Sequence, residues 1–333
     1  MTLLRRGGAP PSGPEPSGPG SRPPVGADQE RLERRQTRFN HFDLKVSPYL
    51  FISPFFLLFA VFGLFPLLYT VWVSLHDWTL LGGNQGFVGI ANYVKLVQDG
   101  KFWNALYNTL GIFAIATVPQ LLLALLLADT LSRRIRAANF WRMGLLLPYL
   151  TSVAAVAIVF SQLFGTQFGL INYGLGFFGI DPVNWKGGTY TSWAAIAVMV
   201  DWRWTGYNAL IYLAAMQAVP KDLYEAASID GASRMRQFWQ ITIPMLRPTI
   251  IFTVIISTIG QMQLFTEPVI FNGGGMSGGT SGQSQTVMML IFEEAFRFNN
   301  YGYGSAIAWT LFVLIVLFGL VNTLLSSRIK GAQ

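Results

Sequence analysis

The sequence predicts an all-α integral membrane protein that crosses the bilayer six times. The chain has 333 residues, of which 52% are hydrophobic and only 12% are charged, and its mean hydropathy is +0.43. Soluble chains carry about 25% charged residues, so this chain lacks the charge that a water-facing surface needs. One crossing of the hydrocarbon core takes about 20 apolar residues, and the sequence contains six apolar runs of about that length.

The six runs lie at residues 49–75, 106–128, 143–164, 192–218, 248–271 and 304–326. We expect each run to form one membrane helix. Their internal glycine and proline residues are compatible with this, because neighbouring membrane helices satisfy the freed backbone groups. Residues 1–45 are rich in Pro, Gly, Ser and Arg and have no apolar periodicity, so we expect a disordered cytoplasmic tail followed by one membrane domain over residues 46–333.

The basic residues predict the orientation of the helices. On one side, 18 Lys and Arg residues lie in the tail, in the loops at 129–142 and 219–247, and at the C-terminus; the opposite loops hold four, Lys95, Lys101, Lys186 and Arg297. Loops rich in Lys and Arg stay in the cytoplasm, so both termini are expected to be cytoplasmic in a multi-pass protein of the cell membrane. The net charge of +7 therefore reflects topology rather than a nucleic-acid partner.

The residue inventory argues against enzyme chemistry in this chain. Cysteine is absent, and the two histidines, His41 and His76, lie outside the long apolar runs. Gly174–Gly179 matches a dinucleotide-binding pattern but lacks the required strand and acidic residue. Gly275–Gly279 matches a nucleophile elbow, but no histidine follows it. We expect no catalytic residue, no metal site and no cofactor held by this chain.

The loop at 219–247 is predicted to form two short helices joined by a sharp turn. Small residues around the turn would let another protein pack closely. The loop is anchored in the membrane and has few basic residues, which argues against DNA binding. The residues that set the ends of the helices are Asp222 and Glu225 as a capping box, Gly231 as the break, Ser233 as the second cap, and Pro244 with Pro248 as the start of the next run.

This loop resembles the EAA loop of binding-protein-dependent ABC importer permeases. That pattern is Glu-Ala-Ala, three residues, Gly, nine residues and Ile-x-Leu-Pro; it is matched by Glu225, Ala226, Ala227, Gly231, Ile241 and Pro244, with Ile243 in place of the usual Leu. The similarity extends over most of residues 48–330. It is nearest to the maltose-type sugar permeases and, among them, to permeases for cellobiose and related disaccharides.

The resemblance implies the type I ABC importer permease fold and a set of partners. These are a second permease subunit that completes a heterodimeric pore, a dimer of ATPase subunits that binds the ATP, an extracytoplasmic sugar-binding protein, the sugar itself and membrane lipid. The EAA loop of the family sits in a cleft of the ATPase. The residues expected to couple ATP hydrolysis to transport are Glu225, Ala226, Ala227, Asp230, Gly231 and Pro244.

Polar and aromatic groups inside two runs mark the expected substrate pathway, because polar residues in a membrane are costly and are usually functional. The fourth run combines aromatic and charged residues over 200–208, and Ile256, Gly260, Gln263 and Glu267 have the spacing of one helix face. The family's substrate contacts match Trp202, Tyr207 and the first three of these positions. The predicted contacts are Trp202, Arg203, Trp204, Tyr207, Asn208, Gln263 and Glu267.

Alternatives remain open from the sequence. Asp201 and Arg203 can instead lie near the outer interface, with Trp202 and Trp204 as interfacial belt residues. The Gly/Ser-rich segment 272–285 is a plain linker or a docking loop for an external partner. A di- or oligosaccharide permease is the main prediction; the alternatives are a glycerol-phosphate or polyol permease and a polytopic membrane enzyme acting on lipid-linked sugars.

Overall fold

The computed structural model describes residues 26, 47–133 and 136–330 of a mostly helical chain, and the side chains of 325–330 are left undescribed. The chain divides into two units, Met1–Leu67 and Leu68–Gln333. Apart from Gly26, the predicted tail at 1–45 lies outside the described residues. The prediction of disorder there is therefore untested.

The first run is confirmed as a helix, Ser47–Ser74, which begins in the first unit and includes η1 (Ala60–Leu64) and α2 (Phe65–Ser74). Within the first unit, the rings of Phe55 and Phe59 stack one helical turn apart, with centroids 6.3 Å from each other. Contacts between residues four apart are the expected local support of a helix.

The second unit opens with a small hairpin that the sequence did not predict. Strand β1 (His76–Thr79) pairs antiparallel with β2 (Gly83–Phe87), with His76 opposite Phe87 and Thr79 opposite Gly83. Helix α3 (Ala91–Gln98) follows, and its Asn92 amide donates to the carbonyl oxygens of Ser74 and His76, at 2.9 and 3.1 Å. This amide fixes the hairpin to the end of α2.

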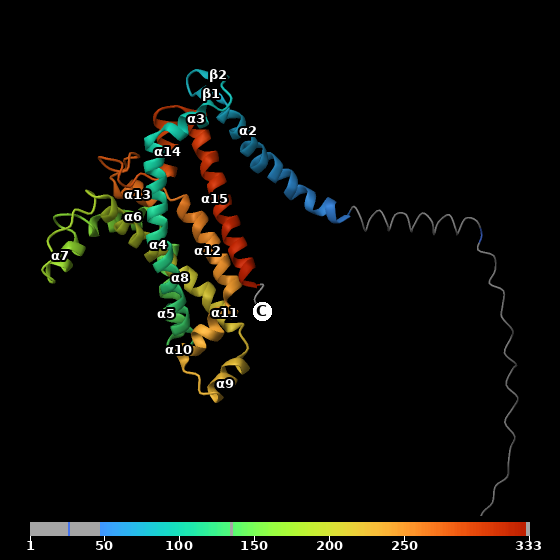
Figure 1. The fold of residues 1–333 in the computed structure, drawn as a ribbon, viewed down its shortest axis with the longest axis vertical. Coiled ribbons are helices and arrows are strands. Elements are labelled where there is room, and N and C mark those ends of the chain that lie inside the picture. Colours follow the sequence, from blue (N-terminus) through green and yellow to red (C-terminus); the bar gives the residue numbers. More distant parts are fainter. Residues whose placement is uncertain (1–25, 27–46, 134–135, 331–333) are drawn as a thin grey trace, which may run out of the picture. The chain divides into compact units, whose positions relative to one another are not determined.

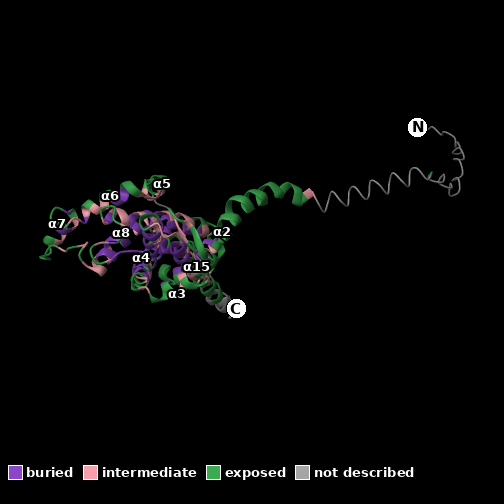
Figure 2. Cartoon of the chain, turned by 90° about the horizontal axis from the view of Figure 1, so that it is seen from above, coloured by how far each residue is buried: buried purple, intermediate pink, exposed green. Residues whose placement is uncertain are grey.

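Four long helices build the core of the second unit. They are α4 (Gly100–Ser132), α8 (Thr189–Gln217), α12 (Arg247–Met262) and α15 (Tyr301–Lys330). Helices α4 and α8 lie against each other along much of their length (Figure 1), and Figure 2 shows buried residues concentrated along them. Alanine and leucine of α4, such as Ala124 and Leu125, pack there with Ala209 and Tyr212 of α8. The second, fourth and sixth runs are thus confirmed as helices.

The third and fifth runs are not single helices, which corrects the prediction. The third is α5 (Ala138–Leu150) and α6 (Val153–Leu163), bent by 92°, and the fifth is α12 followed by α13 (Thr266–Phe271). The hydroxyl of Thr151 donates to the carbonyl of Pro148 (2.7 Å) and so satisfies the end of α5. The hydroxyl of Thr286 donates to the carbonyl of Leu264 (2.7 Å) in the second break. A helix can end inside an apolar run when a side chain donates a hydrogen bond to one of its last backbone carbonyl groups.

The remaining elements are shorter. They are α7 (Leu170–Gly176), α9 (Lys221–Ile229), α10 (Arg234–Gln237), η2 (Phe238–Thr242), α11 (Ile243–Met245), α14 (Val287–Phe292) and η3 (Glu293–Arg297). Among the described residues, three helices are long and apolar enough to cross a membrane, or up to five if each bent pair is one crossing. Helix α8 is 29 residues long but more polar.

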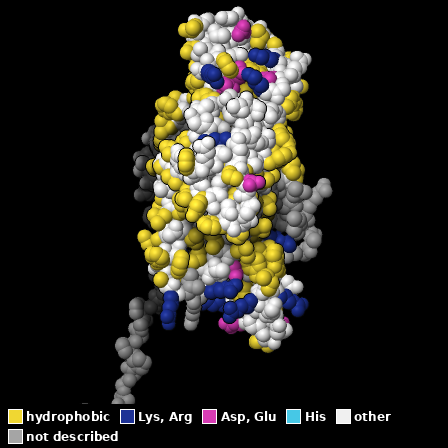
Figure 3. Space-filling view, turned by 90° about the vertical axis from the view of Figure 1, so that its left-hand side faces the viewer, with side chains coloured by type: hydrophobic (Ala, Val, Ile, Leu, Met, Phe, Trp, Pro, Cys, Tyr) yellow, Lys and Arg dark blue, Asp and Glu magenta, His cyan; other side chains and the backbone are white. Residues whose placement is uncertain are grey.

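Charged side chains gather at two ends of the face seen in Figure 3, with a broad band between them that is mostly apolar or uncharged. A band of this kind suits the hydrocarbon region of a bilayer, with charges at the two aqueous interfaces. The distribution agrees with an integral membrane protein. It leaves the predicted cytoplasmic location of the termini as a prediction.

Because α5 and α8 approach each other closely, we expect alanine substitutions at two glycines to have very different effects on stability. A Cβ atom on Gly206 would overlap the carbonyl oxygen of Leu145, whereas a Cβ on Gly144 meets nothing within 4 Å. We expect Gly206→Ala to lower the free energy of unfolding by about 1–3 kcal/mol through overpacking. Gly144→Ala should be neutral or stabilising by up to ~1 kcal/mol, because alanine favours the helix. Thermal unfolding in detergent compares the two, and equal melting temperatures would refute the close packing.

Candidate functional site

Helices α8 and α12 face each other through a ladder of polar side chains. The hydroxyls of Tyr212 and Thr253 share a buried hydrogen bond of 2.6 Å, and the amide of Asn208 donates to the hydroxyl of Ser257 at 3.5 Å. One turn further along both helices, the indole of Trp204 lies 4.0 Å from the position of a Cβ on Gly260. At each of these three levels, a residue of α8 therefore lies opposite a residue of α12. Asn208, a predicted substrate contact, is 2% exposed and is part of this ladder.

Three aromatic rings form a cluster beside the ladder. The ring of Tyr149, from α5, stacks on Tyr207 at a centroid distance of 4.5 Å and meets Trp204 edge-on at 5.4 Å. Trp204 and Tyr207 are 5.9 Å apart and nearly perpendicular. Such a cluster offers apolar ring faces together with polar O–H and N–H groups, which is the combination that sugars require. Both Trp204 and Tyr207 remain half-buried.

Tyr149 was missed by the sequence analysis. It directly follows the Leu147-Pro148 pair in the third run, but no spacing pattern distinguishes it from the other aromatic residues there. Its role depends on the bend after α5, which places that helix alongside α8. The signal was therefore in the packing of two helices and not in the local sequence.

Arg203 and Glu267, both predicted substrate contacts, pair with each other. Nη1 of Arg203 lies 3.0 Å from Oε1 of Glu267, and the two side chains are only 9% and 6% exposed. The pair joins α8 to α13 across the break in the fifth run. Buried ion pairs hold their partners in place, so direct sugar contact by either charge would require the pair to open.

The predicted stripe on the fifth run is only partly continuous. Ile256, Gly260 and Gln263 are exposed on one face, but Glu267 is buried, which corrects the expectation that all four share that face. The cause is the helix break: α12 ends at Met262, and Gln263 is its C-terminal cap. Trp202 lies on another side of α8, where it is 45% exposed and contacts Phe160 at 5.5 Å.

The loop at 219–247 forms the predicted helical hairpin. Gly231 has φ = +76°, in the left-handed region that glycine tolerates, and the hydroxyl of Ser233 accepts a hydrogen bond from the backbone of Arg236 at the start of α10. Both predictions are confirmed. The prediction that Asp222 caps the first helix is wrong, because α9 begins at Lys221 and Asp222 lies in its first turn.

Pro244 has a different position from the one predicted. It lies within the continuous helix Arg234–Met245, and the next helix begins only at Arg247, with Pro248 in its first turn. A proline inside a helix removes one backbone hydrogen bond. The wider π-turn η2 directly before it, in which the Ile243 amide bonds to the Phe238 carbonyl, accommodates this loss.

The residues of the predicted coupling motif lie on the outer surface of the hairpin. Glu225, Ala226, Asp230 and Gly231 are exposed, and Ala227 is half-buried. Two side-chain bonds close the hairpin behind them: the hydroxyls of Tyr224 and Thr242 share one of 2.9 Å, and the Gln237 amide donates to the Ser228 hydroxyl at 2.9 Å. The motif thus lies on a hairpin that two side-chain hydrogen bonds hold closed.

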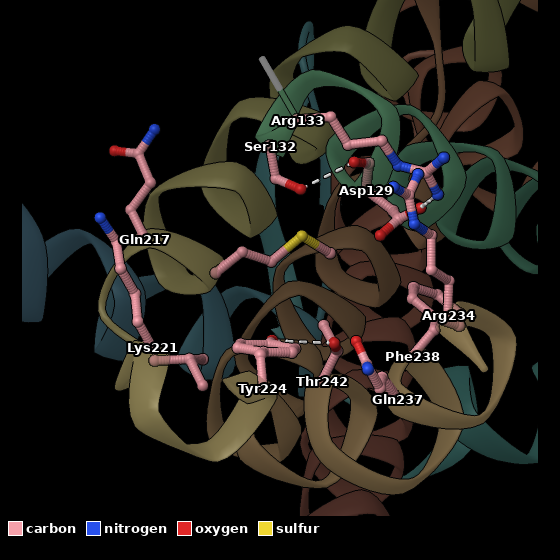
Figure 4. Close-up of a pocket in the computed structure, with 12 residues that line it drawn as sticks. Asp129, Ser132, Arg133, Gln217, Lys221, Tyr224, Arg234, Gln237, Phe238 and Thr242 are labelled. Atoms are coloured by element: carbon pink, nitrogen blue, oxygen red, sulfur yellow. Dashed lines mark hydrogen bonds and ion pairs between the residues drawn. The ribbon is translucent and has the colours of Figure 1, made fainter. Parts of the chain in front are cut away.

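A cavity of about 620 Å³ lies at the base of this hairpin, between the ends of α4 and α8 (Figure 4). The bonded hydroxyls of Tyr224 and Thr242 lie on one wall, while Arg133, Asp129 and Arg234 gather at another. Asp129 forms an ion pair with Arg133. The hairpin therefore contacts the core only over part of its base, through buried Phe238 and its neighbours.

The segment 272–285 is a folded loop on the opposite side of the unit. The Asn108 amide donates to the carbonyls of Gly282 (2.7 Å) and Gln285 (3.0 Å), and the Asn272 amide donates to the Ser284 hydroxyl at 2.8 Å. A free linker would have no such anchors, so the linker interpretation is wrong. The docking-loop alternative stays a prediction.

Comparisons with known proteins agree with these features. The family described as "Binding-protein-dependent transport system inner membrane component" matches residues 112–331. The arabinooligosaccharides transport system permease protein AraP of Bacillus subtilis (strain 168) is 35% identical over 289 residues, covering 86% of this chain and 90% of that protein. The lactose transport system permease protein LacF of Rhizobium radiobacter is 35% identical over 276 residues, covering 82% and 91%.

A third relative is the trehalose/maltose transport system permease protein MalF of Thermococcus litoralis, 33% identical over 273 residues, covering 82% of this chain and 91% of that protein. Among solved structures, a bacterial ABC transporter involved in the import of the acidic polysaccharide alginate superposes with a TM-score of 0.73 at 20% identity. The superposition covers 88% of this chain and 99% of that chain, which shows the same fold.

Proposed function

Because this chain belongs to the family of binding-protein-dependent transport system inner membrane components, we propose that it is the permease subunit of an ATP-driven importer of a di- or oligosaccharide. A permease of this kind is a non-catalytic membrane subunit of an ABC transporter. The sugar specificity of its relatives supports a saccharide as the substrate. A cellobiose-like disaccharide is the specific substrate we propose.

The observation that carries the proposal is the aromatic cluster of Tyr149, Trp204 and Tyr207 beside the exposed face of α12. That face holds Gly260 and Gln263, so an amide and aromatic rings are available at one accessible surface within the membrane domain. Polar groups on such a surface are expected to line a pathway. A second permease subunit would supply the opposite wall.

The hairpin at 219–247 is the proposed contact with the ATPase subunits. Its exposed motif and hydrogen-bonded back suit a unit that fits a cleft and transmits movement to α8 and α12, the helices that precede and follow it in the chain. ATP would be bound by the ATPase alone. An external sugar-binding protein would dock on the opposite face, which includes the folded loop 272–285.

The alternative substrates are less well supported. A glycerol-phosphate permease would need an available cation in the pathway, but Arg203 is neutralised by Glu267. Because the chain belongs to a family of transport components, we do not retain the alternative of a membrane enzyme that acts on lipid-linked sugars. The saccharide permease therefore remains the proposal.

Reconstitution tests the proposed function directly. The chain is assembled in proteoliposomes with its second permease and its ATPase, and uptake of labelled cellobiose, maltose, lactose and arabino-oligosaccharides is measured with the external binding protein present. We expect uptake of at least one sugar that requires ATP and the binding protein. Absence of ATP-dependent uptake for every sugar, from a complex that hydrolyses ATP, would contradict the proposal.

Trp204 provides a residue-level test of the pathway. Trp204→Ala should lower the rate of sugar-stimulated uptake by about tenfold, because it removes an aromatic contact of ~0.5–1.5 kcal/mol together with its apolar area. Trp204→Phe keeps a ring face and should retain most of the rate. Gln263→Ala should also weaken uptake. Unchanged kinetics in the alanine variants would remove both residues from the site.

A further inference from the structure

The cavity at the base of the hairpin is not part of the proposed sugar pathway. It has a volume of about 620 Å³ and is lined by the ends of α4 and α8 together with α9, α10 and η2. Three of its lining side chains, Met216, Val219 and Phe238, are apolar and buried. Sites for small organic ligands combine a volume of this order with apolar walls and a few convergent polar groups. The cavity therefore has the size and lining of a ligand site.

Three cationic side chains line this cavity, and each comes from a different segment. Arg133 is the C-terminal cap of α4, Lys221 is the first residue of α9, and Arg234 is the first residue of α10. In Figure 4 the side chains of Arg133 and Arg234 extend toward each other beside Asp129, whereas Lys221 lies on the other side of the cavity. The fold, and not one basic run in the sequence, brings these charges together.

The cations outnumber the acids of the cavity. Asp129 is the one acidic residue among the described residues that line it, and it forms an ion pair with Arg133. Within the described part of the chain, the side chains of Lys221 and Arg234 take part in no ion pair and no side-chain hydrogen bond. The C-termini of α4 and α8 contribute about half a negative charge each, so about one positive charge remains. The cavity therefore attracts an anion.

The two guanidinium groups favour a phosphate group over other anions. A guanidinium presents its N–H donors in a planar fork that matches two phosphate oxygens, and a phosphate ester has further oxygens for a second arginine. The buried side chains of Met216 and Phe238 suit the organic part of such a ligand. Basic pockets between membrane helices on the cytoplasmic side bind phospholipid headgroups in this way. The lining thus fits an organic phosphate.

We propose that this cavity binds the phosphate group of an organic phosphate between Arg133 and Arg234, and that the bound ligand joins the coupling hairpin to α4. The headgroup of an anionic phospholipid and a soluble sugar phosphate both supply this chemistry. Without a ligand, the hairpin contacts the core over only part of its base, through Phe238 and its neighbours. The effect on coupling rests on the proposed contact with the ATPase, whereas ligand binding itself does not depend on the transported sugar.

Two matched pairs of probes test the binding. The assembled transporter, in a non-ionic detergent and freed of nucleotide and bound lipid, is titrated calorimetrically with short-chain phosphatidylglycerol or zwitterionic phosphatidylcholine, and with glucose 6-phosphate or glucose. We expect the anionic member of at least one pair to bind at least about tenfold more tightly than its partner, as one hydrogen bond between charged groups provides. A response to phosphatidylglycerol alone assigns the site to a lipid headgroup, and a response to glucose 6-phosphate alone assigns it to a soluble ligand. Equal affinity within both pairs would overturn the proposal.

Variants of two arginines on the same short helix locate the site. Arg234→Gln should weaken binding of the preferred anionic probe by about tenfold or more. Arg236→Gln is the matched control and should leave binding unchanged, because Arg236 is exposed and is not among the described residues that line the cavity. Both arginines are exposed, so both variants should keep the wild-type melting temperature. Binding that is unchanged in Arg234→Gln, or equally weakened in both variants, would overturn the assignment to this cavity.

Hydrogen exchange tests whether the ligand joins the hairpin to α4. At about ten times its dissociation constant, the probe should slow exchange of the backbone amides of α9 and α10 by up to about tenfold, because a ligand that holds two segments must leave before they separate. In Arg234→Gln the same probe concentration should give little protection. Binding without slower exchange in the hairpin would overturn the joining role. If the probe binds but the transporter takes up no sugar, the proposed function fails and this site remains.

Discussion

Gly231→Val is expected to abolish sugar uptake while the membrane helices still insert and fold. Gly231 has φ = +76° between α9 and α10, and a side chain there costs about 1–2 kcal/mol for an ordinary L-residue and more for a β-branched one. A Cβ would meet no neighbour within 4 Å, so the effect comes from the backbone and not from a clash. The hairpin relieves the strain by changing its turn, and the motif before Gly231 moves relative to α10.

Gly231→Asn is the matched control, because asparagine tolerates the left-handed conformation better than other residues. It should retain most of the uptake. The measurements are ATP-dependent uptake in proteoliposomes, ATP hydrolysis by the same complex, and the melting temperature of the membrane subunits. We expect the valine variant to lose sugar-stimulated ATP hydrolysis together with transport. Normal uptake in Gly231→Val would refute the coupling role of the hairpin.

Arg203→Met is expected to destabilise the protein by about 3–5 kcal/mol, because it leaves the buried carboxylate of Glu267 without its cation. The pair lies between α8 and α13, so its loss should loosen α13 and the loop that follows it. Unfolding of the purified protein in a denaturing detergent measures the change. Arg133→Met breaks a pair whose arginine is 49% exposed and should cost at most ~1 kcal/mol.

The double variant Arg203→Met, Glu267→Leu provides the decisive comparison. Replacing both members of a buried pair by apolar residues is often neutral or stabilising, so the double variant should recover most of the lost stability. Its uptake shows whether the pair is needed beyond folding. A double variant as unstable as Arg203→Met would mean that the arginine contributes through other contacts.

The coupling hairpin was predictable because its signals are local. Gly231 and Ser233 determine the turn through their own backbone and the next few amides, and both acted as expected. Asp222 was wrongly expected to be a cap, because α9 starts at Lys221 and Pro220 takes the cap position. Helix starts can differ by one or two residues without changing the pattern of side chains, so sequence patterns locate them poorly.

The breaks in the third and fifth runs were not predictable from composition. An apolar run has the same hydropathy whether it continues straight or bends, and the bend depends on groups that accept its end carbonyls. The hydroxyl that holds the second break belongs to Thr286, 22 residues from Leu264. The aromatic cluster likewise depends on Tyr149 reaching Tyr207 from a different helix.

The sequence by itself determined the membrane class, the placement of most helices and the position of the coupling hairpin, because hydropathy, charge and turn chemistry are properties of short segments. Only the tertiary structure decided which polar groups are free. Arg203 and Glu267 are 64 residues apart and equally costly in a membrane, but they pair with each other at 3.0 Å, whereas none of the ion pairs among the described residues includes Asp201. Pairing depends on how distant helices pack, and so the unpaired carboxyl group could be recognised only once α8, α12 and α13 were in place.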